Sequence, residues 1–116
     1  ILLLYLNIIM KNILYNDTEI IIGQNSKENW DILDKYSSNS CWFHLKSFPS
    51  CFVIVNTIDI NNDIIKYAAE LCKQNTKYKN VPNIKVNYTN TSNIKKADTE
   101  GSVYFKSNRK VKEIII

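Results

Sequence analysis

Short apolar runs near the start of the patterned region predict a β-hairpin. Residues 13–15 and 19–22 are apolar and are separated by Asn16 and Asp17, two residue types that tolerate the left-handed backbone of a tight turn. Gly23 follows the second run and ends it. We therefore expect two antiparallel strands joined by a turn at Asn16 and Asp17.

A helix is predicted directly after this hairpin. Trp30, Leu33 and Tyr36 recur at helical spacing, and Ser26 precedes them as a residue that can cap the helix. The polar run 37–40 is expected to be the loop that ends it.

The most regular helical pattern lies in the middle of the chain. A cap at Asn61 or Asn62 is expected to start this helix, and the helix is expected to end near Asn75. Its predicted apolar stripe consists of Ile64, Ile65, Ala68, Leu71 and Cys72. Its predicted solvent-facing residues are Lys66, Glu70, Lys73 and Gln74.

Five further runs of β-branched, aromatic or alternating residues predict strands. They cover residues 41–45, 51–55, 84–88, 102–105 and 111–115. The first two are separated by a turn at Pro49, and the last two are expected to form a hairpin around Asn108 and Arg109. The order of elements, ββαββαβββ, predicts an α+β domain in which a mostly antiparallel sheet has two helices packed on it.

Length and composition limit the chain to a single domain. It has 116 residues, 45% of them hydrophobic, with 2 Gly and 2 Pro, which excludes multi-domain, collagen-like and disordered classes. Residues 1–9 are apolar and are expected to lie outside the fold, because Met10, just ahead of the first patterned segment, is the expected natural start. The predicted domain is therefore residues 10–116.

The apolar stretch at residues 1–9 is far shorter than the roughly 20 residues needed to span a bilayer. It also lacks the basic region and small-residue cleavage site of a signal peptide. We therefore expect no membrane span and a cytoplasmic protein.

Positive charge is concentrated towards the C-terminal end. The net charge is only +4, but residues 76–112 hold nine basic and two acidic residues, a net +7. A basic third on a near-neutral body is typical of a surface that faces a polyanion such as nucleic acid. Ile, Asn and Lys make up 48 of the 116 residues, which is typical of an AT-rich genome, so a solvated lysine-rich face is the alternative explanation.

Residues suited to catalysis or metal binding are sparse. Cys41 and the only histidine, His44, are three positions apart in a predicted strand and so point to opposite faces. The sequence has no glycine-rich phosphate loop, no HExxH and no GxSxG motif. Cys51 and Cys72 are expected in the core as reduced thiols rather than in a disulfide framework or a zinc site. These features argue against an enzyme, a metal site and a bound cofactor.

Residues 23–29 combine a glycine, amide side chains and the first turn of a helix. Free N–H groups and the helix dipole at such a turn favour an anion, so a phosphate is the expected ligand. The candidate contacts are Gln24, Asn25, Lys27 and Asn29. An ordinary strand-to-helix turn is the alternative.

A second candidate surface lies on the strand at residues 41–45. Alternation places Trp42, His44 and Lys46 on one face, and a face with an aromatic ring, an imidazole and an ammonium is a poor core and a reasonable ligand surface. A histidine satisfied under a sheet edge is the alternative.

The third candidate segment is the lysine pair Lys95 and Lys96, which follows Asn93. The aromatic residues Tyr88, Tyr104 and Phe105 are close in sequence, and this mixture of charge and stacking surface is what single-stranded nucleic acid uses. A solvated loop is the alternative.

Three strings in these regions resemble one known family. They are GQNSKEN, CWFHLKSFPSCFVIV and VNYTNTSNIKKADTEGSVYF. Their order and spacing resemble the NFACT RNA-binding domain (NFACT-R) of ribosome quality-control factors over residues 20–115. The layout is most similar to the stand-alone coiled-coil-domain-containing protein 25 group.

The family motifs match this chain residue by residue. The first motif falls on Gly23, Asn25 and Asn29. The second falls on Trp42, Phe43, His44, Lys46 and Pro49, and the third on Val86, Tyr88, Thr89, Asn93, Lys95 and Lys96. Two departures stand out, because residues 40–41 are Ser-Cys where the family usually has Asp-Ile, and residues 50–52 are Ser-Cys-Phe where it usually has Gly-Ser-His.

The resemblance implies a non-catalytic nucleic-acid-binding domain. RNA of the tRNA or ribosomal kind is the expected partner, and DNA binding or docking on a ribosome-associated protein are the alternatives. The candidate site residues are Gln24, Asn25, Lys27, Asn29, Trp42, His44, Lys46, Asn93, Lys95 and Lys96.

Overall fold

A computed structural model describes residues 11–36 and 39–116, so the apolar stretch at residues 1–9 lies outside the described residues. Within them the chain forms an α+β domain, which confirms the predicted class. The main sheet is built from β1 (Lys11–Tyr15), β2 (Thr18–Ile22), β3 (Cys41–Leu45), β4 (Val53–Val55), β5 (Lys85–Asn90) and β8 (Lys112–Ile115). A small second sheet pairs β6 (Ile94–Lys96) with β7 (Val103–Phe105). The helices are α2 (Ser26–Lys35) and α3 (Asn62–Gln74), with the 3-10 turns η1 (Thr91–Asn93) and η2 (Asn108–Lys110).

The main sheet has the strand order β1-β2-β4-β3-β5-β8, and every neighbouring pair is antiparallel. The predicted hairpin at its start is confirmed. Asn16 and Asp17 adopt positive φ angles of 49° and 66°, which lets the chain reverse in two residues. The interior strands β2, β3, β4 and β5 carry most of the buried apolar side chains, because both of their faces are covered.

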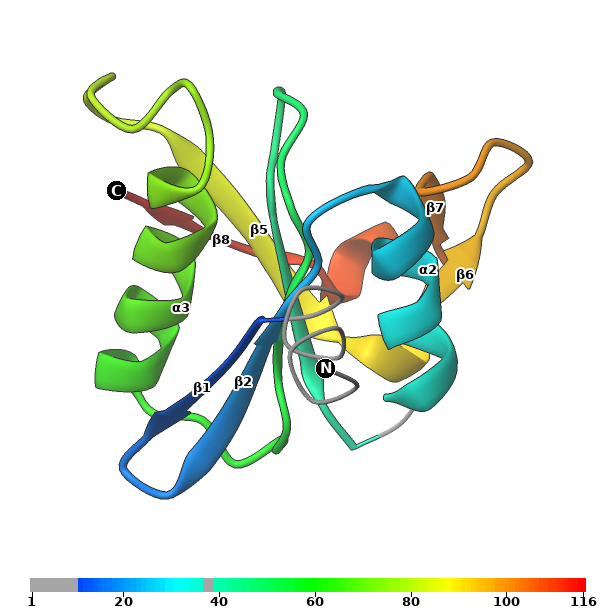
Figure 1. Cartoon of the computed structure of the whole chain (residues 1–116), viewed down its shortest axis with the longest axis horizontal. Helices are drawn as coiled ribbons and strands as arrows, with labels where there is room; N and C mark the ends of the chain where they lie inside the picture. The colour runs from blue at the N-terminus through cyan, green and yellow to red at the C-terminus, as the bar shows by residue number, and fades with distance from the viewer. Residues whose placement is uncertain (1–10, 37–38) are drawn as a thin grey trace, which may run out of the picture.

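The two helices pack on opposite faces of the sheet (Figure 1). On one face, α3 buries Ala68 and Cys72 against Phe43, Val53 and Val86. The opposite face is covered by α2 together with the β6–β7 hairpin, in a cluster that includes Trp42 and Ile54. Alternate side chains of β3 and β4 therefore point to opposite faces of the sheet and pack into two separate hydrophobic cores. None of the helices in the described ranges is both long and apolar enough to cross a membrane.

The predicted hairpin between residues 102–105 and 111–115 is wrong. β7 pairs with β6 through Lys95 and Tyr104, whereas β8 returns to the main sheet and pairs with β5 through Asn87 and Glu113. The cause is Asn93, whose buried side chain accepts from the Ser107 N–H at 2.8 Å and donates to the Ser107 carbonyl at 2.9 Å. These two bonds hold the chain where it leaves β7 and enters η2.

Helix ends follow the predictions with two differences. Asn61 caps α3 as expected, with Oδ1 accepting from the Ile64 N–H at 2.9 Å. The cap of α2 is Asn25, one residue before the predicted Ser26. Lys73, predicted to face solvent, is buried, because its stem lies along the core and its ammonium donates to the Ile116 carbonyl at 3.2 Å.

Candidate nucleic-acid interface

The start of α2 is held by a reciprocal set of hydrogen bonds. Asn25 Oδ1 accepts from the Glu28 N–H at 2.9 Å, and Glu28 Oε1 accepts from the Gln24 N–H at 2.9 Å. Gln24, Asn25 and Lys27 are exposed, and Lys27 forms an ion pair with Asp31 at 2.9 Å. A fixed helix N-terminus directs the positive end of the helix dipole towards solvent. This end of α2 is therefore preorganised to receive an anion.

Asn29 joins the first turn of α2 to the start of β4. It is only 7% exposed, and its Oδ1 accepts from the Phe52 N–H at 3.1 Å. The Gly23 N–H in turn donates to the Phe52 carbonyl at 3.0 Å. A Cβ placed on Gly23 would lie 2.1 Å from Asn29 Oδ1, so this contact requires glycine. Asn29 is thus a positioning residue rather than an exposed phosphate contact.

A cavity of about 460 Å³ opens between α2, β3 and the loop that joins β6 to β7. Ser26 and Asn29 line it from α2, and Trp42, His44 and Lys46 line it from β3 and the residue that follows. The same cavity is completed by Pro49, Ser50, Phe52, Asn87, Glu100, Gly101, Ser102 and Phe105, among others. We call it the α2–β3 cavity. Four of the ten candidate site residues line it, namely Asn29, Trp42, His44 and Lys46.

The rings of Trp42 and His44 are stacked, with centroids 5.5 Å apart and planes 3° from parallel. They share a face, as alternation predicts, but the expectation that this face is a poor core is wrong. Trp42 is 2% exposed because the edges of Phe52 and Phe105 pack against its ring, each with centroids 5.5 Å away. Its indole N–H is buried and has no hydrogen-bond partner within residues 11–36 and 39–116. A ligand acceptor or an ordered water is what such a donor requires.

His44 is half-buried beside the α2–β3 cavity. Its Nδ1 lies 2.6 Å from the Leu45 carbonyl oxygen, which can only accept, so Nδ1 carries the proton. Burial lowers the pKa of His44 below its ordinary value, and the backbone hydrogen bonds at Leu45 and Ser50 oppose this only in part. The imidazole is therefore neutral at pH 7 and offers hydrogen bonding rather than charge.

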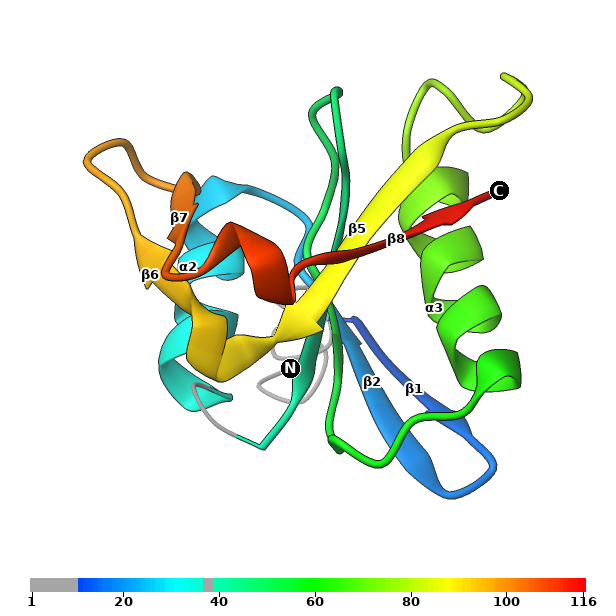
Figure 2. The ribbon, with the colours of Figure 1, turned by 180° about the vertical axis from the view of Figure 1, so that it is seen from behind.

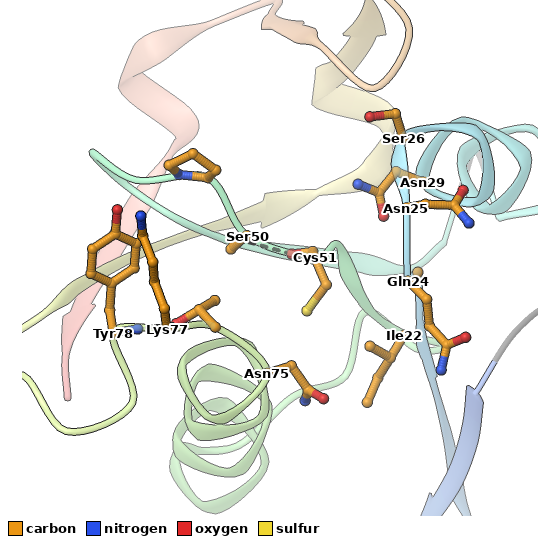
Figure 3. Close-up of a pocket in the computed structure, with 13 residues that line it drawn as sticks. Ile22, Gln24, Asn25, Ser26, Asn29, Ser50, Cys51, Asn75, Lys77 and Tyr78 are labelled. Carbon is orange, nitrogen blue, oxygen red and sulfur yellow. Dashed lines mark hydrogen bonds between the residues drawn. The ribbon is translucent and has the colours of Figure 1, made fainter.

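A second cavity, of about 670 Å³, lies on the other side of the loop between β3 and β4 (Figure 3). Gln24, Asn25 and Asn29 line one side, and Lys77 and Tyr78 line the opposite side, beyond the end of α3. It shares Ser26, Asn29, Pro49 and Ser50 with the α2–β3 cavity. The exposed amides at the start of α2 thus face a lysine that the sequence did not single out.

Lys95 and Lys96 lie apart from the α2–β3 cavity. Lys96 forms an ion pair with Asp34 at 2.6 Å, and its ammonium lies 5.2 Å from the centre of the Trp30 ring. Lys95 is exposed, and both lysines line a separate hollow of about 300 Å³ beside the last turn of α2. Lys46, at the rim of the α2–β3 cavity, is paired with Glu113.

Asn93 lies inside the fold rather than on its surface. Its side chain is buried and donates to Thr89 Oγ1 at 3.1 Å as well as bonding both backbone groups of Ser107. The structure therefore brings together Asn29, Trp42, His44 and Lys46 at the α2–β3 cavity, places Lys95 and Lys96 in the separate hollow beside the last turn of α2, and uses Asn93 inside the fold.

Sequence reasoning missed the loop that closes the α2–β3 cavity. Gly101 has a φ of 88°, and a Cβ on it would lie 2.8 Å from the Ser26 Cβ, so this loop packs on the start of α2. The chain has 2 Gly, and both contact this helix turn. Their scarcity in the sequence was the available signal for the site.

Cys41 and His44 do not come together in the described part of the chain. Cys41 packs in the α3-side core, on the opposite face of β3 from His44. No group of three or more His, Cys, Asp or Glu side chains that could hold a metal ion occurs in residues 11–36 and 39–116.

The structure is thus an α+β domain in which segments separate in sequence meet at one cavity, and comparison with known proteins shows its family. The sequence model of the NFACT protein RNA binding domain matches residues 10–107. The chain belongs to this family, which confirms the resemblance to the NFACT RNA-binding domain.

The C-terminal part of the fibronectin/fibrinogen-binding protein from Streptococcus suis has the same fold. The TM-score is 0.82 at 22% sequence identity, over 92% of this chain and 44% of that chain. This chain therefore spans less than half of that structure. No curated protein sequence in the comparison matches the chain.

Proposed function

We propose that this chain is a non-catalytic RNA-binding domain that binds structured RNA of the tRNA or ribosomal kind in the cytoplasm. The observation that carries the proposal is that two segments matching the family motifs, residues 23–29 and 42–49, meet around the α2–β3 cavity although they are separate in sequence. Membership of an RNA-binding family supports the ligand class.

Each part of this surface has a role that its chemistry supports. The exposed start of α2, with Gln24, Asn25 and Lys27, receives a backbone phosphate. Neutral His44 offers a hydrogen bond to a base or a sugar at the α2–β3 cavity, and the Trp42 ring stacked on it holds the imidazole in place. Lys46 adds charge at its rim. The proposed binding surface therefore carries its charged groups at the rim of the α2–β3 cavity and at the start of α2, and its neutral polar groups inside the cavity.

Lys95 and Lys96 extend this surface along α2. Three of the four candidate lysines are held in ion pairs, with Asp31, Glu113 and Asp34. Exposed ion pairs of this kind are worth only about 0–1 kcal/mol, so a phosphate displaces the carboxylate at little cost. The pairs orient the lysines before RNA binds.

The salt dependence of binding tests this proposal. A fluorescently labelled tRNA transcript is titrated with the full chain over a range of salt concentrations, and we expect log K to fall steeply with log salt. Lys46→Ala and Lys95→Ala should each weaken binding and reduce the slope by about 1. Lys66→Ala, an equal change of charge on the exposed side of α3, should leave both unchanged. A salt-insensitive affinity, or equal effects in all three variants, contradicts the proposal.

Two competition experiments separate the alternatives. Duplex DNA should displace the tRNA transcript poorly if RNA is the ligand. Proteins recovered with the chain from a cell extract should be lost after nuclease treatment, whereas direct docking on a ribosome-associated protein would survive it.

A further inference from the structure

A third large cavity, of about 640 Å³, lies beside η2 and the end of β5. Figure 2 shows η2 leading into β8 alongside the end of β5. Lys106, Lys110 and Lys112 line the cavity together with Tyr88 and Ile58. It shares no lining residue with either cavity beside α2. We call it the η2 cavity.

The charge of the η2 cavity is positive and unbalanced. Lys106, Lys110 and Lys112 are exposed, and none of them takes part in an ion pair within the described ranges. No carboxylate is among its lining residues. The neighbouring acid Glu113 is paired with Lys46 instead. Three ammonium groups around one hollow, with no carboxylate of the described residues between them, favour a multiply charged anion such as a phosphate monoester.

Buried hydrogen bonds fix the backbone that carries these lysines. Thr89 Oγ1 donates to the Lys110 carbonyl at 3.0 Å, and the Lys106 N–H donates to the Asn93 carbonyl at 2.9 Å. Asn93 also bonds both backbone groups of Ser107. Thr89 and Asn93 are each 5% exposed. The lysine backbone is thus held in place before any ligand arrives, which reduces the entropy lost on binding.

The remaining wall of the η2 cavity is apolar and partly aromatic. Tyr88 is half-buried, and its ring is stacked on Phe43 with centroids 5.3 Å apart and planes 12° from parallel, so its position is fixed. Ile58 is 55% exposed, and Ile60 lies beside it. An exposed isoleucine next to three lysines fits a ligand with a flat apolar part as well as an anionic part. The volume lies within the range of about 300–1,000 Å³ typical of small-ligand sites.

We propose that the η2 cavity binds a phosphorylated nucleotide, with the phosphate at Lys106, Lys110 and Lys112 and the base against Tyr88 and Ile58. This site goes beyond the proposed RNA surface, because it shares no lining residue with the α2–β3 cavity and does not depend on it. The nucleotide is either the phosphorylated end of an RNA chain or a free mononucleotide, since the two present the same chemistry.

Amide chemical shifts of the full chain test the proposal. Adenosine 5′-monophosphate is expected to move the signals of Tyr88, Asn90 and residues 106–112, while adenosine and inorganic phosphate each bind at least about tenfold more weakly. The double variant Lys106→Ala/Lys110→Ala should lose about tenfold or more in affinity for the mononucleotide. The matched control Lys77→Ala/Lys79→Ala removes equal charge elsewhere and should bind normally. As a control, the amide spectra of the variants without ligand should match that of the wild type, which shows that the variants are folded.

Short RNA oligonucleotides with a 5′-phosphate or a 5′-hydroxyl distinguish the two sources. Shifts at the η2 cavity only with the 5′-phosphate indicate an RNA end, and shifts with the mononucleotide alone indicate a free nucleotide. The proposal is overturned if neither phosphorylated ligand moves these signals, if adenosine or inorganic phosphate binds as tightly as the mononucleotide, or if the double variant binds like the control. Loss of tRNA binding in Lys46→Ala and Lys95→Ala bears on the proposed function alone, so the two proposals can fail separately.

Discussion

Asn29 Oδ1 accepts a hydrogen bond from the Phe52 N–H across 23 positions of sequence, and it thereby fixes α2 against the start of β4. The bond lies at the junction of the two cavities beside α2, both of which Asn29 lines. The shape of the proposed RNA surface therefore depends on a buried amide that does not need to contact RNA itself.

Replacing Asn29 by alanine should destabilise the fold. The buried Phe52 N–H would lose its acceptor, which costs about 1–3 kcal/mol. Urea denaturation measures the loss. Asn80→Ala, the same substitution at an exposed loop position, should be nearly neutral. Equal stability of the two variants would show that the Asn29 bond contributes nothing.

Both glycines should resist substitution by alanine. Gly23→Ala places a Cβ against Asn29 Oδ1, and Gly101→Ala combines a φ of 88° with a contact to Ser26. The left-handed backbone alone costs about 1–2 kcal/mol for an alanine. Thermal denaturation should show both variants less stable than wild type, whereas the neighbouring Ser102→Ala should melt normally. A Gly101→Ala protein of wild-type stability would contradict this packing.

Alanine substitutions of the adjacent residues Lys95 and Lys96 should differ in their effect on the stability of the fold. Lys96→Ala removes the ion pair with Asp34 and the contact with the Trp30 ring, together worth about 1 kcal/mol. Lys95→Ala removes an exposed side chain that forms no ion pair in the described ranges. Urea denaturation should therefore separate the two variants, and identical midpoints would argue against the role assigned to Lys96.

A feature of the fold could be predicted from the sequence when the residues that cause it are close together in the chain. The Asn16–Asp17 turn and the Asn61 cap depend on residues close in sequence, and both were predictable. The pairing of β7 with β6 was not, because it is decided by Asn93 bonding to Ser107 across 14 positions. A strand as short as β6, with two lysines in three residues, gives almost no pattern of its own.

In the candidate site, too, features with a local cause could be predicted from the sequence and those set by distant residues could not. Alternation correctly placed Trp42 and His44 on one face, but it could not show what covers that face. α2 and Phe105 do so, and they turn Trp42 into a core residue. The exposed amides at the start of α2 were identified from the sequence because helix caps have a local signature.

The free energy of unfolding should depend on the titration of His44. Its folded pKa lies below the ordinary 6.5, so the unfolded chain takes up a proton first as the pH falls. Stability from this residue is therefore complete above about 6.5 and is lost as the pH falls towards the folded pKa. Urea denaturation across this range should show a decline that His44→Gln lacks. The same decline in both proteins would assign it to other groups.

The three cysteines should react with iodoacetamide in a fixed order. Cys51 lines the 670 Å³ cavity, and a hydrogen bond with Cys72 lowers its pKa. Burial raises the pKa of Cys41 to about 11 and also raises that of Cys72. Mass spectrometry at neutral pH should find Cys51 alkylated first, and unfolding in urea should remove the difference. Earlier labelling of Cys41 would contradict the structure.

Ultraviolet crosslinking of the full chain to RNA in cells, with identification of both the RNA and the attached peptide, tests the central claim most directly. We predict that tRNA or ribosomal RNA is recovered, attached to the peptides that carry His44 and residues 102–105. Recovery of no RNA, or crosslinks confined to α3, would contradict the claim that this domain binds structured RNA at the α2–β3 cavity.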